Sequence, residues 1–254
     1  MHRYGLIGRK LGHSFSKKHF TAVFRKAGLK DHRYDLYELP EIEALPDLLR
    51  RTPGLHGLNV TVPYKEAVIP FLDELDPLAA AVGAVNTIVV KDGRTQGHNT
   101  DVAGFRSLLA RAARALDKPG SAIRPRALVL GSGGASRAVA YVLREAGIRF
   151  RIVSRSRNRG DLTWDLIDPV ILRVCRLVVN TTPLGMYPDV HDAPPLPYSV
   201  LTPQHTLIDL VYNPEETLFL KHGLEHGAKA IGGAGMLRVQ ADEAWRIWQA
   251  ARKG

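Results

Sequence analysis

The chain has 254 residues, 45% of them hydrophobic, and its formal net charge is +10 at pH 7. This length allows one large domain or two modest ones, each with its own core. No apolar run reaches the roughly 18 residues that a membrane helix needs, and residues 1–8 lack the apolar core of a signal peptide. The single cysteine, Cys175, excludes an intramolecular disulfide. We therefore expect a cytoplasmic protein that does not bind membranes.

The positive charge has two interpretations. A nucleic-acid-binding protein concentrates Lys and Arg on one face and interleaves aromatic residues for stacking. Here the arginines are scattered, with local clusters at 111/114 and 149–159, and aromatic residues make up only 7% of the chain. The charge also suits anionic small ligands, because it raises their local concentration. We expect a small-molecule substrate and no nucleic acid, which stays open as an alternative.

The first half of the chain predicts alternating strands and helices. Its expected strands are 3–8, 84–91 and 96–100, with a hairpin turn at Asp92-Gly93, and its expected helices are 19–27 and 102–116. The second half begins at Arg126 with a buried parallel strand, 127–130, followed at once by a glycine-rich loop and a helix over 136–146. Further strands are expected at 149–154, 177–180 and 206–211, and a closing helix at 236–252. This β-α-β succession predicts a doubly wound sheet with a cofactor at the strand ends.

Lys65 and Asp101 are the candidate catalytic pair. Lys65 closes the run Asn59-Val60-Thr61-Val62-Pro63-Tyr64-Lys65, and Asp101 closes Asn99-Thr100-Asp101. Proton transfer to a substrate oxygen needs one group that carries the proton and another that holds and tunes it. A solvated surface pair is the alternative for any single Lys and Asp.

The glycine-rich loop predicts a nucleotide site. It consists of Gly131, Ser132, Gly133, Gly134 and Ala135, between a strand and a helix. Gly131 permits a tight turn and Gly133 a close approach of the backbone to a pyrophosphate, while the helix N-terminus supplies free N–H groups. Ser136 stands where the usual fingerprint has a third small residue. The alternative is a glycine turn of an ordinary α/β protein.

The cofactor is expected to be NADP. NAD binding usually requires a carboxylate about 20 residues after the loop, which accepts a hydrogen bond from the ribose 2′-hydroxyl. This chain has Ser154-Arg155-Ser156-Arg157 there, whose guanidinium and hydroxyl groups suit a 2′-phosphate. Arg155 can also lie flat on the adenine, whereas a solvated basic turn remains an alternative for Arg157.

Other polar residues are candidate ligand contacts. Ser14 and Ser16 would form a fork for a carboxylate if their segment is extended. Thr61 and Asn86 fall at strand positions where a polar side chain needs a partner or a ligand, and internal hydrogen bonds are the alternative. Thr181 and Met186 follow a strand end and are expected on the nicotinamide side, and Tyr212, Gly233 and Gln240 are expected near the same site. His13, His98 and His205 lack metal-ligand spacing, so no metal is expected.

Taken together, these runs closely resemble the shikimate dehydrogenases over nearly the whole chain. The motifs, in family order, are Ser-x-Ser, Asn-Val-Thr-Val-Pro-Tyr-Lys, Gly-Ala-Val-Asn-Thr, Asn-Thr-Asp-x-x-Gly-Phe, Gly-Ser-Gly-Gly-Ala, Asn-x-Thr-Pro-Leu-Gly-Met, Asp-x-Val-Tyr-x-Pro and Gly-x-x-Met-Leu-x-x-Gln. The resemblance implies two α/β domains flanking a deep cleft: a substrate domain of residues 1–101 plus 236–254, and a Rossmann-type NADP domain of residues 102–235.

The resemblance also implies residue roles. Ser14 and Ser16 would hold the shikimate carboxylate with Tyr212 nearby, and Lys65 with Asp101 would form the catalytic pair. Ring hydroxyls would be bound by Thr61, Asn86, Asp101 and Gln240. The family reduces 3-dehydroshikimate to shikimate with NADPH. Two departures stand out: Lys17 replaces the proline that usually follows Ser-x-Ser, and Ser154-Arg155-Ser156 replaces the usual Asn-Arg-Thr.

Alternatives are a quinate/shikimate dehydrogenase with relaxed substrate or cofactor use, and a non-catalytic NADP-binding regulator. A monomer and a homodimer are both open.

Overall fold

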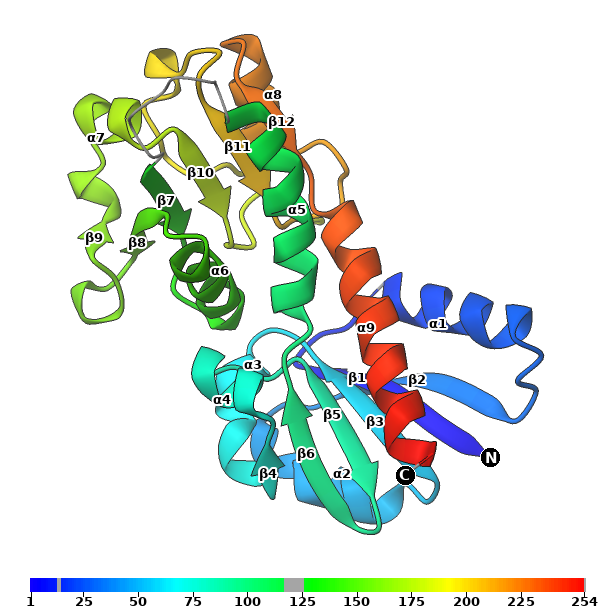
Figure 1. Cartoon of the computed structure of the whole chain (residues 1–254). Coiled ribbons are helices and arrows are strands. Elements are labelled where there is room, and N and C mark those ends of the chain that lie inside the picture. The colour runs from blue at the N-terminus through cyan, green and yellow to red at the C-terminus, as the bar shows by residue number, and fades with distance from the viewer. Residues whose placement is uncertain (13–14, 117–125, 254) are drawn as a thin grey trace. The chain divides into compact units, whose positions relative to one another are not determined.

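The computed structural model describes residues 1–12, 15–116 and 126–253. The chain divides into two compact units (Figure 1). Unit 1 is Met1–Thr100 with Gln240–Gly254, and unit 2 is Asp101–Val239. This division places Asp101 in unit 2 and resumes unit 1 at Gln240, whereas the boundaries expected from the sequence lie after residue 101 and at residue 236.

Unit 1 contains a mixed six-stranded sheet in the order β2-β1-β3-β5-β6-β4. The strands are β1 (His2–Gly8), β2 (His32–Glu38), β3 (Leu55–Val60), β4 (Glu74–Leu75), β5 (Thr87–Lys91) and β6 (Arg94–His98). The helices are α1 (Phe15–Lys26), α2 (Leu45–Arg51), α3 (Tyr64–Ala67), α4 (Pro77–Val82) and most of α9 (Ala234–Lys253), with 3-10 turns η1 (Ile42–Ala44) and η2 (Ile69–Phe71).

Apolar layers cover both faces of this sheet because side chains alternate along its strands. Tyr4 packs with aromatic residues of α1 and with Trp248 of α9, whereas Ile7 packs on the opposite face with leucines of α2. The indole Nε1 of Trp248 donates to the Ile88 carbonyl at 2.9 Å. Helix α9 is therefore anchored on the same face as α1 (Figure 1).

Unit 2 contains a six-stranded sheet that is parallel throughout its described pairings, in the order β12-β11-β10-β7-β8-β9. The strands are β7 (Arg126–Leu130), β8 (Arg149–Ser154), β9 (Leu162–Thr163), β10 (Leu177–Asn180), β11 (Thr206–Asp209) and β12 (Lys229–Ile231). The helices are α5 (Asp101–Leu116), α6 (Gly134–Glu145), α7 (Pro169–Val174) and α8 (Leu218–Glu225), with 3-10 turns η3 (Arg157–Arg159), η4 (Trp164–Leu166) and η5 (Tyr198–Val200).

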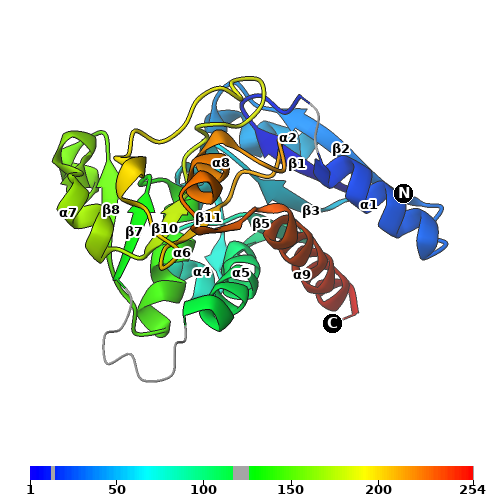
Figure 2. The same cartoon turned by 90° about the horizontal axis from the view of Figure 1, so that it is seen from above.

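Unit 2 is the doubly wound arrangement that the sequence predicts. Helices α5 and α6 lie side by side (Figure 2), and α7 and α8 contribute Leu172 and Phe219 to an apolar cluster with Leu128 of β7. The chain crosses from β8 and β9 back past β7 to β10, so the strand order reverses beside β7. The carboxyl end of β7 is therefore the topological switch point at which such sheets bind ligands. The expected fold class, two α/β domains with the second of Rossmann type, is confirmed.

The hairpin between β5 and β6 confirms the turn signal. Asp92 and Gly93 have φ angles of 50° and 74°, as a two-residue primed turn requires. The preceding strand is shorter than expected, beginning at Thr87 rather than residue 84. The Asn86 backbone still bonds to Val60 and His98, but the Val85 N–H donates to the Lys65 carbonyl at 2.7 Å instead of to a neighbouring strand.

The Ser14–Ser16 fork requires an extended segment, and the described part of that segment, Phe15 and Ser16, is helical. Phe15 and Ser16 form the first turn of α1, and Ser14 lies outside the described residues. Ser16 bonds to the Tyr34 hydroxyl, a long-range contact that local alternation of side chains cannot foresee.

Candidate active site

Lys65 is held in place by its own backbone and by the side chain of the preceding Tyr64. The preceding Tyr64 side chain is buried, and its hydroxyl donates to the Leu39 carbonyl at 2.6 Å. The Lys65 carbonyl accepts from the Val85 N–H at 2.7 Å. These bonds fix the backbone that presents the ammonium and bring it beside the segment that carries Asn86.

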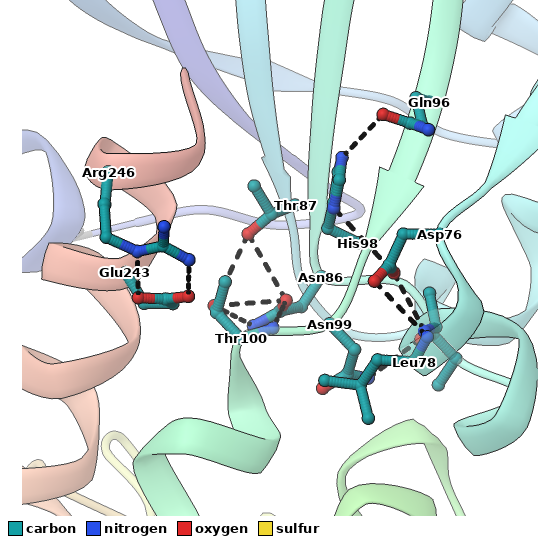
Figure 3. A network of polar contacts seen from close by, with 12 residues as sticks. Asp76, Leu78, Asn86, Thr87, Gln96, His98, Asn99, Thr100, Glu243 and Arg246 are labelled. Atoms are coloured by element: carbon teal, nitrogen blue, oxygen red, sulfur yellow. Dashed lines mark hydrogen bonds and ion pairs between the residues drawn. The ribbon is translucent and has the colours of Figure 1, made fainter. Parts of the chain in front are cut away.

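Asn86 is the centre of a buried polar network in unit 1 (Figure 3). Its Oδ1 accepts from the Thr100 N–H at 2.7 Å, and its Nδ2 donates to Thr100 Oγ1 at 3.0 Å. The same Nδ2 donates to Gln240 Oε1 at 3.0 Å. Asn86 and Thr100 are only 2% and 1% exposed. The structure thus brings together Asn86 and Gln240, two of the predicted substrate-binding residues.

The network continues through Tyr34 and Asn59. Tyr34 donates to Asn59 Oδ1 at 2.8 Å, and Asn59 Nδ2 donates to Thr87 Oγ1 at 3.1 Å. Burial raises the pKa of Tyr34, and its hydrogen bond to Ser16 opposes that shift. The chain of contacts therefore runs from Ser16 to Asn86. No local sequence signal joins Tyr34 to Asn59, which lies 25 residues further on.

Thr61 directly follows strand β3, and Asp101 begins helix α5. Thr61 follows β3, and its N–H donates to the Ile7 carbonyl at 2.9 Å. A Cβ on Gly8 would lie 2.6 Å from Thr61 Cγ2, so this close approach requires glycine. Asp101 is the first residue of α5, directly after Thr100, and is 1% exposed. Since Lys65 and Asp101 belong to different units, their pairing stays a prediction.

The histidines considered as metal ligands make other contacts. His98 bonds to Gln96 Oε1 at 3.1 Å and lies 3.8 Å from Asp76 (Figure 3). Burial lowers the pKa of His98, against the opposing effects of Asp76 and Glu243. His205 bonds to the Leu172 carbonyl at 3.0 Å, and His13 lies outside the described residues. Within the described part of the chain, no three His, Cys, Asp or Glu side chains gather as metal ligands would.

The glycine-rich loop connects β7 to α6, as the sequence predicts. Gly131 has a φ of +108°, and a Cβ there would lie 2.7 Å from Thr181 Oγ1. A Cβ on Gly133 would meet nothing within 4 Å, so open space lies above the backbone at the N-cap of α6. Free helix N–H groups beside an open glycine backbone are what a pyrophosphate needs. The donors present here therefore fit a dinucleotide.

The residues expected to read the 2′-phosphate follow β8. Ser132 Oγ and Ser154 Oγ are 2.9 Å apart, which ties the glycine-rich loop to the end of β8. Arg155, Ser156 and Arg157 are exposed beyond that link. Within the same turn, Arg159 donates to the Ser132 carbonyl at 3.1 Å. Exposed guanidinium groups, with no Asp or Glu among residues 154–157, suit a 2′-phosphate.

The remaining predicted residues of unit 2 lie on loops after β10, β11 and β12. Thr181 Oγ1 donates to the Leu130 carbonyl at 2.7 Å, and the Met186 side chain is 39% exposed. Burial raises the pKa of Tyr212. A Cβ on Gly233 would lie 2.5 Å from the Leu210 carbonyl oxygen. Gly233 therefore has a packing reason to be glycine, and its contact with a cofactor stays a prediction.

Comparison with known proteins places the chain in a family. A family profile described as the shikimate dehydrogenase substrate binding domain matches residues 6–88, within unit 1. The shikimate dehydrogenase (NADP(+)) of Desulforamulus reducens is 36% identical, over 96% of this chain and 88% of its own. The chain belongs to the shikimate dehydrogenase family.

Solved structures of the family agree with the fold. The Thermus thermophilus shikimate 5-dehydrogenase in complex with NADP(H) and shikimate is 34% identical, with a TM-score of 0.83 over 98% of this chain and 94% of its own. The quinate dehydrogenase of Corynebacterium glutamicum in complex with NAD is 30% identical, with a TM-score of 0.82 over the same shares of the two chains. No helix among the described residues is both long and apolar enough to cross a membrane.

Proposed function

We propose that this protein is a shikimate dehydrogenase, which catalyses the reversible NADPH-dependent reduction of 3-dehydroshikimate to shikimate in aromatic amino-acid (chorismate) biosynthesis. The observation that carries the proposal is the Asn86 network. Its Nδ2 bonds Thr100 Oγ1 and Gln240 Oε1, and Lys65 is tied to the same segment through Val85. Amide and hydroxyl groups at these positions suit a ligand with several hydroxyl groups.

The substrate-binding residues divide by chemistry. Hydroxyl groups of Ser14 and Ser16 bind the substrate carboxylate, with Tyr212 nearby. The ring hydroxyls are bound by Thr61, Asn86, Asp101 and Gln240. The hydrogen bond between Ser16 and Tyr34 supports this assignment, because it holds a carboxylate-binding hydroxyl in place through a buried partner.

The reaction needs a proton at the substrate oxygen. NADPH, when bound, supplies the hydride that reduces the carbonyl carbon. Lys65 Nζ donates a proton to the oxygen as negative charge develops there, and its own charge stabilises that oxygen in the transition state. Asp101 orients the Lys65 ammonium. In the direction of shikimate oxidation, Lys65 takes the proton back.

Residues of unit 2 hold NADP. The pyrophosphate is bound by Gly131, Ser132, Gly133, Gly134 and Ala135 at the N-terminus of α6. Ser154, Arg155, Ser156 and Arg157 bind the 2′-phosphate and adenine. Thr181, Met186 and Gly233 line the nicotinamide side. The open space at Gly133 and the exposed arginines after β8 support this assignment.

A quinate/shikimate dehydrogenase with relaxed specificity is the second candidate. The likeness to a quinate dehydrogenase in complex with NAD favours it. A non-catalytic NADP-binding regulator and a nucleic-acid-binding protein are less well supported, since neither needs Lys65 beside the Asn86 network. The protein acts in the cytoplasm, as a monomer or a homodimer.

Initial rates of NADP reduction with shikimate test the proposal, with quinate and NAD run in parallel. Turnover with shikimate and NADP alone is the expected result. Comparable rates with quinate or NAD would establish the relaxed enzyme instead. A folded protein that binds NADP but turns over neither substrate would be the regulator, and salt-dependent retention on DNA would favour the nucleic-acid-binding protein.

A further inference from the structure

Three fully buried polar side chains meet at the carboxyl ends of β10 and β11 in unit 2. Asn180 ends β10, Asp209 ends β11 and Thr217 precedes α8, and each is 0% exposed. The carboxylate accepts from Asn180 Nδ2 at 3.0 Å, from the Val211 N–H at 3.0 Å and from Thr217 Oγ1 at 2.6 Å. One buried carboxylate therefore accepts from donors on three different segments of the chain.

These bonds extend into the loop after β10. Asn180 Oδ1 accepts from Thr182 Oγ1 at 2.6 Å and from the Thr182 N–H at 3.0 Å, and Asn180 Nδ2 also reaches the Leu184 carbonyl at 3.4 Å. The Val211 N–H begins the loop after β11, which continues to Tyr212. Asp209 thus connects the loop of residues 181–186 with the loop of residues 210–217.

The strand order indicates which half of a dinucleotide lies near the loops of residues 181–186 and 210–217. The pyrophosphate site is at the carboxyl end of β7, and the arginines suited to the adenosine 2′-phosphate follow β8, on one side of β7. β10 and β11 lie on the other side of β7. A dinucleotide laid across the switch point therefore places its second nucleoside, the nicotinamide half, at the ends of β10 and β11.

We propose that Asp209 is a positioning residue for the nicotinamide half of NADP. This inference rests on the proposed function. In it, the buried carboxylate acts without touching substrate or cofactor. Asp209 acts through Asn180 and the Val211 N–H, which hold the two loops at their observed spacing. The adenosine half, bound at the ends of β7 and β8, does not depend on it.

Binding of two ligands separates positioning from general stability. The ligands are NADPH and 2′-phospho-ADP-ribose, which keeps the adenosine, 2′-phosphate and pyrophosphate but lacks nicotinamide. Removing three hydrogen bonds from a buried site in Asp209→Ala is expected to weaken NADPH binding about tenfold or more. The affinity for 2′-phospho-ADP-ribose should stay within about twofold of wild type.

Two further variants complete the test. Asp209→Asn keeps one oxygen acceptor and can donate to Thr217 Oγ1, so it should restore most of the NADPH affinity. Thr217→Val preserves shape but removes the hydroxyl that donates to Asp209 and accepts from the Leu220 N–H. It should give a smaller loss of affinity, confined to NADPH. It takes the place of Asp209→Ala in the test if that variant does not fold. An equal loss of affinity for both ligands would overturn the positioning role. An unchanged affinity for NADPH in both variants would also overturn it. A wild-type protein that binds neither ligand would overturn the proposed function itself.

Discussion

Asn86 donates to Gln240 at 3.0 Å across a sequence separation of 154 residues. Asn86 precedes β5, and Gln240 is the residue at which α9 enters unit 1. Because both side chains are predicted to bind ring hydroxyls, their mutual hydrogen bond orients the two amides for the same ligand. The C-terminal helix is therefore part of the candidate substrate site as well as of the core.

Gln240→Ala should raise the KM for shikimate about tenfold, since one hydrogen bond in a buried site is lost, and should change the KM for NADP little. Steady-state kinetics with each substrate varied measure this. Gln249→Ala on the exposed side of the same helix is the matched control. Equal effects of the two substitutions would exclude a binding role for Gln240.

Lys65→Met should lower kcat by roughly 10²- to 10⁴-fold, the usual contribution of general acid–base catalysis. The substitution keeps the length of the side chain, so the Kd for shikimate, measured by calorimetry, should change little. Lys91→Met removes an exposed ammonium from the same unit and is the control. A variant that keeps its kcat would show that Lys65 does not carry the proton.

Arg155→Ala should reduce kcat/KM for NADP by about tenfold or more, because a charge-assisted bond to the 2′-phosphate is lost. It should reduce kcat/KM for NAD much less, because only the contact with the adenine is lost there. The ratio of the two values is the readout. Arg149 lies at the opposite end of β8 and is also exposed, so Arg149→Ala should leave the ratio as it is. An unchanged ratio in Arg155→Ala would remove the basis for NADP preference.

Tyr34→Phe should raise the KM for shikimate several-fold, since it frees Ser16 and Asn59 from a shared hydroxyl. Tyr198 offers the control, because its part-buried hydroxyl donates to the Pro194 carbonyl at 2.7 Å in unit 2. Tyr198→Phe should cost comparable stability and leave the KM unchanged. A parallel rise in both variants would point to general loosening rather than to substrate binding.

Asp209 also predicts a pH effect on stability. Burial raises its pKa to about 6, although bonds to Thr217, Val211 and Asn180 oppose the shift. The raised pKa stabilises the fold fully below the unfolded value of 3.8, and this contribution is lost as the pH rises through about 6. Since one pKa unit corresponds to about 1.4 kcal/mol, the loss approaches roughly 3 kcal/mol.

Asp209→Asn does not titrate, so its free energy of unfolding relative to wild type should increase from pH 4.5 to pH 7.5. Urea denaturation at several pH values measures the difference. Asp189→Asn, which changes an exposed carboxylate, should show no such trend. A flat difference for Asp209→Asn would mean that the carboxyl is not shifted upward.

Much of unit 2 could be predicted because its signals are local. The apolar run before Gly131 and the basic turn after Ser154 each stand next to the strand that they end. The site in unit 1 was only partly predictable. Lys65 and Asn86 belong to recognisable runs, but the role of Tyr34 depends on contacts with residues that are distant in sequence. The helical conformation of Phe15 and Ser16 differs from the extended segment that the fork requires.

Unit 2 is an uninterrupted stretch of chain, whereas unit 1 is made of two separated stretches. Trp248, 1% exposed, fills the core of unit 1 from the second stretch. During synthesis on the ribosome, unit 2 can fold as soon as its last strand emerges. The apolar surface of unit 1 that α9 covers stays exposed until α9 has been synthesised. A nascent chain halted before Trp248 should therefore hold a protease-resistant unit 2 beside a unit 1 that proteases still digest.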